Sequence, residues 1–332
     1  MSGFVDLPDL CRSLQILAWP AHGEPLALLP LETSTDAHFP ARTLGFPGWR
    51  WLATDHLDVI ARSEHASEAT LAFLAHLRSS TDWDMLDLDG LRAESWIARH
   101  AAGAFSLPRF VHRPLEATEV KHLDLVRGDG GRLFSPNTTR RTRQDLESAT
   151  SAGGGFEILS TPNDIVRGLP EMMDLHQARF GSSSQIFSTA LRRTFHLTVA
   201  ARMGQAGTLR LYRLRVGDIT AAASYVPVWD GTLYFYGEGL QPHAAKRSPG
   251  LSVKVLAMLD AQREGLRRAD FCRGDHEWKR RLTQEAQFDV RVRVVRCSLR
   301  SAAVAGRAGA RRLRRPHGFS GPARRNPATD NP

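Results

Sequence analysis

The sequence predicts a mixed α/β fold, in which helices cover the faces of a mixed sheet. From Phe156 onward, apolar patterns with a period of two and of about 3.6 residues alternate, in the order strand, two helices, three strands, helix, strand, helix, strand. The three central strands are joined at Gly-Asp and Asp-Gly turn signals, which favour a meander. The 332 residues suffice for two domains of ordinary size.

The first half of the chain also alternates between strand and helix patterns. Helical spacing is clearest at 63–80, where Leu71, Leu74 and Leu77 recur and serines flank the run. A glycine-rich segment at 126–137 is the best candidate for a domain boundary. Further strands are expected at 14–20, 26–30, 82–91 and 109–113, and a second helix at 94–105.

The second half begins with a polar helix that carries several arginines. Ser135 or Asn137 is expected to cap its start, and the glycines at 153–155 to end it. In the last strand, Phe288, Val290, Val292 and Val294 are expected on one face, and Asp289, Arg291 and Arg293 on the other. The other helices are expected at 163–180, 188–204, 250–266 and 275–282, and the strands at 156–159, 208–217, 219–231, 232–240, 268–273 and 288–297.

Composition favours a soluble globular protein. Hydrophobic residues make up 42% of the chain and charged residues 24%, with no apolar run of the roughly 18 residues that a membrane-spanning helix needs. The N-terminal residues lack the apolar core of a signal peptide. The three cysteines are far apart and odd in number, which predicts a cytoplasmic protein with no metal site.

The net charge of +9 is concentrated in the C-terminal tail. Residues 300–332 contain eight arginines and one aspartate, a net +7, so the rest of the chain carries only +2. Because the tail is rich in Gly, Pro and Ala, we expect it to be largely disordered and to solubilise the chain. Docking on anionic lipid or on nucleic acid through the tail is the alternative, and sequence-specific nucleic-acid recognition is not expected.

The stretch KRSPGLSVKVL, residues 246–256, predicts an anion site at a helix start. Ser248 is expected to cap the helix, Pro249 suits its first turn, and Gly250 lets a ligand approach the backbone. Lys246 and Arg247 add two cations where the free N–H groups and the helix dipole already favour negative charge. The pattern therefore favours phosphate or pyrophosphate binding, although helix capping alone also explains a Ser-Pro start.

The segment RSPGLSVKVLAMLDAQREGLRRADFCRGDHEWKRRL resembles the signature of the GNAT-type acetyltransferases associated with cellulose biosynthesis. The family more often has tyrosine at the position of Trp278, so the ring is kept and a phenol is lost. The arginine-rich stretch at 139–147 and the meander at 209–240 also resemble this family, and the likeness covers roughly 130 to 285. The matching positions are Ser248, Pro249, Gly250, Gly265, Asp270, Phe271, Gly274, Asp275, Trp278 and Lys279.

The resemblance implies a GNAT fold in which acyl-CoA lies between the fourth and fifth strands. It also implies a degenerate GNAT-like N-terminal half, as in the related Fem-type transferases, and hence domains at 1–125 and 130–298 with a tail at 299–332. Carried over, the pyrophosphate lies on Arg247, Ser248, Pro249 and Gly250, and the pantetheine runs beside Tyr236, Gly237 and Glu238.

Acyl transfer to an amine needs a general base, a group that holds the thioester carbonyl, and an acid for the leaving thiolate. Glu238 and Asp275 are equal candidates for the base, although Glu238 is otherwise a solvated loop residue and Asp275 a helix cap. His276 titrates in the useful range, but an exposed helical histidine is the commoner outcome. Tyr236, with Tyr225 and Tyr234 nearby in sequence, is the candidate acid.

Three further residues are candidates for holding a phosphate or an anionic acceptor. Lys279 is one, unless it pairs with Asp275 one helical turn away. Arg140 is another, unless it only forms a solvated helix face with Arg141 and Arg143. Trp278 completes the set, while Cys272 is expected to be an inert core residue.

These observations predict a cytoplasmic transferase that moves an acyl group from acetyl-CoA or another acyl-CoA to an amine or hydroxyl, without a metal. The acceptor is unidentified, a small molecule or a glycan precursor, and polysaccharide or envelope biosynthesis is the setting that the resemblance suggests. Two alternatives stay open. One is a Fem-type transferase that uses aminoacyl-tRNA, and the other is a non-catalytic GNAT-shaped scaffold.

Overall fold

The computed structural model describes residues 14–35, 41–48, 52, 54–112, 116–126, 132–184, 186–242 and 248–298. Within these residues helices flank a mixed sheet, which confirms the predicted α/β fold class. The predicted cations Lys246 and Arg247 and the basic tail at 299–332 lie outside the described residues. None of the described helices has both the length and the apolar character needed to cross a membrane.

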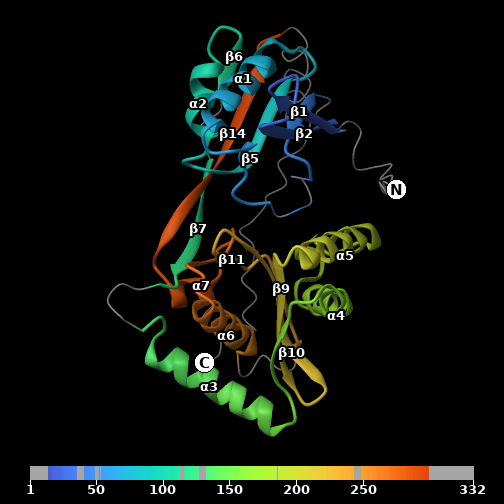
Figure 1. Cartoon of the computed structure of the whole chain (residues 1–332), viewed down its shortest axis with the longest axis vertical. Coiled ribbons are helices and arrows are strands. Elements are labelled where there is room, and N and C mark those ends of the chain that lie inside the picture. Colours follow the sequence, from blue (N-terminus) through green and yellow to red (C-terminus); the bar gives the residue numbers. More distant parts are fainter. Residues whose placement is uncertain are drawn as a thin grey trace, which may run out of the picture.

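The N-terminal half packs two helices against a group of strands (Figure 1). Phe73, Leu74 and Leu77 of the first helix are buried in its core, as their helical spacing predicts. Its elements are β1 (Leu14–Trp19), β2 (Ala27–Thr35), β3 (Arg42–Gly45), β4 (Ile60–Ala61), α1 (Ala66–Ser79), β5 (Met85–Arg92), α2 (Trp96–Ala104), β6 (Phe110–His112) and β7 (Glu116–Asp124).

The second half places helices on both faces of its strands. Its elements are α3 (Pro136–Ser151), β8 (Gly155–Leu159), α4 (Pro162–Phe180), α5 (Ala190–Gln205), β9 (Leu209–Val216), β10 (Ile219–Trp229), β11 (Thr232–Tyr234), β12 (Gly237–Leu240), α6 (Pro249–Arg263), β13 (Arg268–Asp270), α7 (Glu277–Leu282) and β14 (Ala286–Arg296). Alternate residues of β9 divide between two cores: Tyr212 packs in the cluster with α6, and Leu211 packs in the cluster with α4 and α5. Ser135 caps α3, as predicted, by accepting a hydrogen bond from the Thr138 amide.

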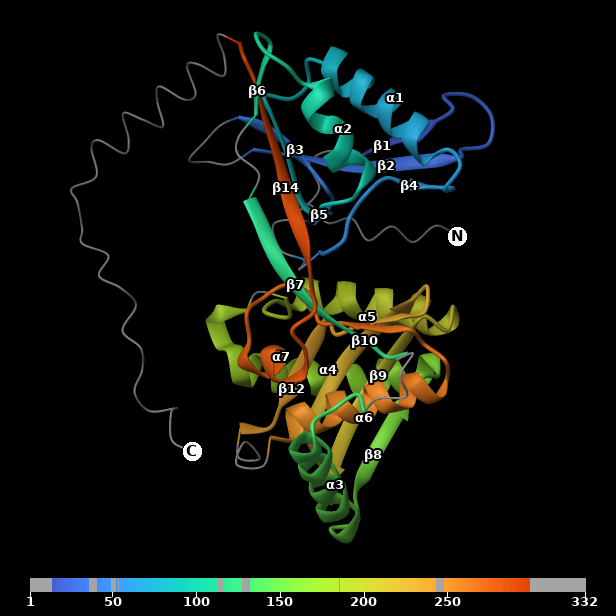
Figure 2. The same cartoon turned by 90° about the vertical axis from the view of Figure 1, so that its left-hand side faces the viewer.

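The two halves share one continuous sheet. Its strand order is β1-β2-β3-β5-β14-β7-β13-β11-β10-β9-β8. The long strands β7 and β14 run between the upper and lower parts of the molecule in Figures 1 and 2. Because β14 pairs with β5, β6 and β7, a strand predicted for the second domain completes the sheet of the first.

The predicted faces of β14 need one correction. Val290, Val292 and Val294 are buried as expected, but Phe288 is 50% exposed and Asp289 is only 1% exposed. Asp289 is buried because its carboxylate contacts His56 at the junction between the two halves.

At this junction, the loop before β4 is held to β13 and β14 by a buried ionic cluster. The side chain of His56 lies between two carboxylates, with Nδ1 2.9 Å from Asp289 Oδ1 and Nε2 3.1 Å from Asp270 Oδ2. Burial alone lowers the pKa of His56, but the two carboxylates outweigh it and raise the pKa to about 9. Arg273 holds the same loop, since its amide and its guanidinium both bind Asp55.

We expect this junction to weaken in alkaline solution. A histidine whose pKa is raised by folding contributes stability that is complete below 6.5 and is lost as the pH rises through about 9. The His56→Gln variant is expected to lose about 2–3 kcal/mol of unfolding free energy at neutral pH and to lack this alkaline decline. Thermal unfolding measured across that pH range, with the exposed His22→Gln as the control, checks both expectations. An equal alkaline decline in the His56 variant would contradict them.

Candidate active site

The strand predicted at 232–240 is split into β11 and β12, and the split opens a wedge in the sheet. The strand β11 pairs in parallel with β13, and Tyr234 lies opposite Asp270 at the end of the pair. The Phe235 amide still donates to the Asp270 carbonyl, but β12 pairs with β10 and not with β13. The chain after β13 therefore diverges from β12, and the space between them is open to a ligand.

A cavity of about 350 Å³ occupies this wedge. We call it the β12 cleft. It is formed by β12 with the link before it, α6, the end of α4 with the residues after it, the segment from β13 into α7, and Asp55 of the loop before β4. Its lining residues are Asp55, His176, Phe180, Ser183, Ser184, Ile186, Phe235, Tyr236, Gly237, Glu238, Lys254, Phe271, Cys272, Arg273, His276, Trp278 and Lys279.

Glu238 is part of a buried ionic cluster in the β12 cleft. Its carboxylate binds the ammonium of Lys254 directly and lies 2.8 Å from Nη1 of Arg179. Burial alone would raise the pKa of Glu238, but Lys254 and Arg179 outweigh it and hold the pKa at about 2. A carboxylate with such a pKa accepts a proton poorly near neutrality, so the geometry disfavours the predicted role of general base.

The start of α6 lies one helical turn before Lys254, which lines the cleft, and Ser248 does not cap the helix as predicted. Ser248 has a φ of 55° and its side chain makes no capping hydrogen bond; its carbonyl instead accepts from the amides of Leu251 and Ser252. A Cβ added at Gly250 would meet only Leu240 Cδ1, at 3.6 Å, so the backbone there is open to approach. Lys254, one turn later, donates to the Gly250 carbonyl and points into the β12 cleft.

Two of the predicted residues near α7 lie differently from expectation. Asp275 is exposed, binds Arg280 and is not among the residues that line the cleft. It does not cap α7 either, because the residue before the helix is His276. Lys279 is buried and donates to the carbonyls of Cys272 and Arg273, both at 2.9 Å, so it fixes the cleft wall and does not pair with Asp275.

Trp278 places its ring near two buried cations. The ammonium of Lys254 is 4.7 Å from its ring centroid and that of Lys279 is 5.7 Å away, so the ring face partly compensates both charges. Arg140, by contrast, is exposed on α3, donates to Asn137 and does not line the cleft. The structure thus brings Tyr236, Gly237, Glu238, Trp278 and Lys279 together and leaves Asp275 and Arg140 outside.

A second cavity, of about 380 Å³, meets the β12 cleft. Asp55, Tyr236 and Cys272 line both, and Tyr236 therefore stands between them. Burial raises the pKa of the Cys272 thiol far above its ordinary value, so this sulfur stays protonated. We call this the aromatic cavity; it is lined by Leu52, Thr54, Asp55, His56, Leu57, Phe195, His196, Val199, Met203, Tyr225, Pro227, Trp229, Tyr234, Tyr236 and Cys272.

Sequence reasoning missed several residues that form the β12 cleft. Lys254 reads as one polar residue in an apolar helix, and Arg179 and His176 as ordinary members of α4. No local motif marks them, because the cluster forms only when α4 and α6 pack on β12. A lysine amid the buried positions of α6 was the one available signal.

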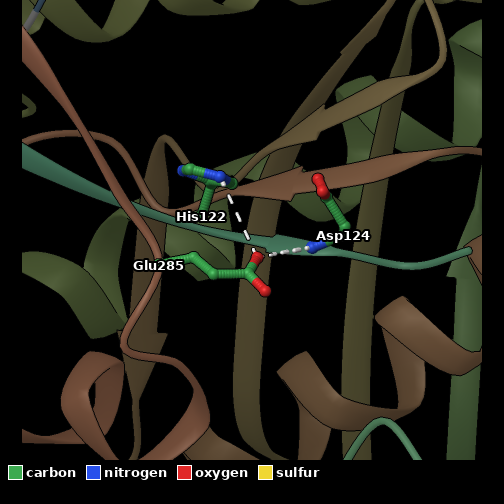
Figure 3. A group of neighbouring side chains, drawn as sticks. All are labelled: His122, Asp124 and Glu285. Carbon is green, nitrogen blue, oxygen red and sulfur yellow. Dashed lines mark hydrogen bonds and ion pairs between the residues drawn. The ribbon is translucent and has the colours of Figure 1, made fainter. Parts of the chain in front are cut away.

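Among the residues that the structure describes, one group of possible metal ligands lies away from the cleft. His122, Asp124 and Glu285 each place one ligand atom within 4.8 Å of the others. Figure 3 shows the Glu285 carboxylate between the His122 ring and the backbone amide of Asp124. The Asp124 carboxylate is already bound by Arg268 at 2.8 Å, and two of the three side chains are about half exposed. These contacts explain the group without a metal, and the absence of a metal site stays a prediction.

Comparison with solved structures shows what this fold resembles. The C-terminal domain of a protein described as a lysylphosphatidylglycerol synthetase, from Agrobacterium fabrum, superposes with a TM-score of 0.55 at 13% identity, over 90% of this chain and 88% of that one. FemX superposes with a TM-score of 0.56 at 9% identity, over 84% and 87%. A conserved protein of unknown function from Bacteroides thetaiotaomicron has a TM-score of 0.52 at 12% identity, over 81% and 83%. At these identities the likeness shows the fold alone.

The family comparison covers the segment that builds the cleft. Residues 136–280 match the model of the acetyltransferase (GNAT) domain, and these bounds include β11, β12, β13 and the start of α6. The match confirms a GNAT-type domain in this segment, as the resemblance predicted, and supports a transferase. No curated protein matches the sequence, and membership of the cellulose-associated group stays a prediction.

Proposed function

We propose that this protein transfers an acyl group from acyl-CoA to an amine or hydroxyl of an acceptor that enters the aromatic cavity. The observation that carries the proposal is the wedge beside β12, which opens a cleft of about 350 Å³ inside the matched GNAT domain. A cleft of this size accepts the thioester arm of acyl-CoA, and Lys254, one turn after the start of α6, lines it.

The donor is proposed to run from the start of α6 into the β12 cleft. The backbone at Pro249 and Gly250 offers the positive end of the helix dipole to the pyrophosphate, with Ser248 and Arg247 as the other predicted contacts. The pantetheine then passes Gly237, and its thioester ends near Tyr236. At that point the carbonyl carbon of the thioester faces Tyr236, which lines both the β12 cleft and the aromatic cavity.

The acceptor is proposed to have an apolar or ring-bearing body. Most side chains of the aromatic cavity are aromatic or aliphatic, and Trp229, Tyr225 and Phe195 are among them. Such side chains favour apolar surfaces and ring faces over compact anions. This proposal replaces Arg140, Trp278 and Lys279 as acceptor contacts, because none of them lines this cavity.

Binding measurements test the donor assignment. Titration calorimetry and thermal shifts with acetyl-CoA, longer acyl-CoAs and CoA are expected to show saturable binding and stabilisation. Stabilisation by none of them, with transfer that depends on charged tRNA, would overturn the acyl-CoA proposal in favour of the aminoacyl alternative. A cytoplasmic location and a link to polysaccharide biosynthesis are proposals that this experiment does not address.

Tyr236 is proposed to protonate the departing thiolate. In the Tyr236→Phe variant, kcat is expected to fall about 10²-fold with little change in KM for the acyl-CoA, because a general acid acts in the transition state. The matched control is Tyr225→Phe, whose ring packs edge-on against Tyr236 at 5.7 Å but lines only the aromatic cavity. Release of CoA thiol, followed with a disulfide reagent, measures both. Equal losses in the two variants would contradict a special role for Tyr236.

A further inference from the structure

A serine and a histidine that the proposed acyl transfer does not use lie in contact in the β12 cleft. Nε2 of His176 is 2.8 Å from Oγ of Ser184, and both residues line the cleft. Nδ1 of the same ring is 2.7 Å from the backbone carbonyl of Glu238. Hydrogen bonds at both nitrogens thus hold the His176 ring between Glu238 of β12 and Ser184, which follows α4.

These contacts determine the direction of each hydrogen bond. A carbonyl oxygen only accepts, so Nδ1 must carry the proton and donate to Glu238. In the neutral ring Nε2 then holds a lone pair, and the Ser184 hydroxyl must donate to it. This is the arrangement of an activated nucleophile: a hydroxyl bonded to a base, and the base oriented by a third group.

The surroundings keep His176 neutral. Burial lowers its pKa; the Glu238 carbonyl and carboxylate oppose this effect and Arg179 reinforces it. Because the Glu238 carboxylate is held by Lys254 and Arg179, it is not available to ion-pair with the imidazole. The rings of Phe180 and Phe187, at 4.6 and 4.9 Å, pack against the imidazole and restrict its movement.

We propose that Ser184 is a nucleophile that takes the acyl group as a covalent ester on the enzyme. Ser184 Oγ attacks the thioester carbonyl while His176 Nε2 accepts the hydroxyl proton. The C–S bond then breaks, Tyr236 protonates the departing CoA thiolate, and the proton held by His176 restores the Tyr236 hydroxyl through solvent. The acceptor amine, or water, then attacks the ester carbonyl and gives a proton to the neutral His176; the bond to Ser184 Oγ breaks, and His176 returns that proton to Ser184. This proposal rests on the proposed function for the identity of the donor, and it adds a slow acyl-CoA and ester hydrolysis to the transfer.

The cleft supplies its own control for this proposal. Ser183 lines the same cleft and is adjacent in sequence, but its hydroxyl donates to the backbone carbonyl of Phe180 and has no imidazole beside it. A serine labelled merely because it is accessible would be Ser183 as readily as Ser184. A serine labelled because a base activates it must be Ser184.

The test uses the full chain and two acyl donors. The protein is mixed with acetyl-CoA, or with nitrophenyl acetate, which needs no nucleotide site, and is quenched in acid before intact-mass and peptide analysis. We expect an acetyl ester on Ser184, an initial burst of nitrophenol, and loss of both in Ser184→Ala and His176→Gln but not in Ser183→Ala. The burst amplitude is expected to fall at least tenfold in the first two variants. Circular dichroism checks that each variant is folded.

The outcomes separate this inference from the function on which it rests. Acetyl transfer from acetyl-CoA with no ester on Ser184 in early quenches overturns the inference and leaves the function intact. Labelling of Ser184 by nitrophenyl acetate in a protein that does not bind acetyl-CoA supports the nucleophile and overturns the donor. Equal labelling of the Ser183→Ala and Ser184→Ala variants overturns the inference as well.

Discussion

Replacing Gly250 with glutamate is expected to lower the affinity for acetyl-CoA at least ~100-fold, which corresponds to about 2.7 kcal/mol. The glutamate would place an anion in the first turn of α6, where the pyrophosphate is proposed to bind, and would repel it. The fold is expected to survive, because a Cβ at this position would meet only Leu240 Cδ1, at an ordinary contact distance of 3.6 Å. Titration calorimetry with acetyl-CoA measures the loss.

Two further variants separate charge from bulk at this position. Gly250→Gln has nearly the shape of the glutamate without its charge, and Gly250→Ala adds only the methyl group. We expect the alanine variant to bind acetyl-CoA normally and the glutamine variant to lose much less affinity than the glutamate variant. A folded Gly250→Glu protein with unchanged affinity would remove the start of α6 from the donor site.

The second half of the fold was predictable because its signals are local. The helix at 250–266 and the meander strands at 208–217 and 219–231 have uninterrupted apolar periods and recognisable turn residues, and they appear near the expected positions, whereas the strand at 232–240 is split in two. The strand β7 was not expected, since the sequence EATEVKHLD has a weak alternation and its first four residues are exposed. Its place between β13 and β14 depends on partners more than 140 residues away in sequence.

The sequence predicted where the candidate site lies, but not what each of its residues does. The Ser-Pro-Gly helix start and the strand end at Glu238 indicate the correct region, because both belong to contiguous motifs. The role of Glu238 depends on its partners, and Lys254 and Arg179 come from two different helices. The junction at His56 likewise depends on contacts between a loop, β13 and β14, and no local sequence pattern predicts those contacts.

Removing either member of the buried pair Glu238–Lys254 is expected to destabilise the protein by about 3 kcal/mol, since each change leaves a buried charge without its partner. In Lys254→Met, the Glu238 carboxylate keeps only Arg179, whose side chain is 34% exposed. In Glu238→Gln, the ammonium keeps the Gly250 carbonyl and the face of Trp278. The double variant is expected to be more stable than either single variant, because neither charge is then left without its partner. Urea unfolding of the four proteins measures this coupling.

The same cycle decides whether Glu238 is structural or a general base. With a pKa of about 2, Glu238 is expected to hold Lys254 and the cleft wall in place and not to accept a proton. The two single variants should therefore lose activity together with stability, and the double variant should regain both. Thiol release, measured at a temperature where all four proteins are folded, provides the comparison. A double variant that is as stable as the natural chain and yet turns over at least ~10²-fold more slowly would restore Glu238 as the base, because only lost proton transfer explains that combination.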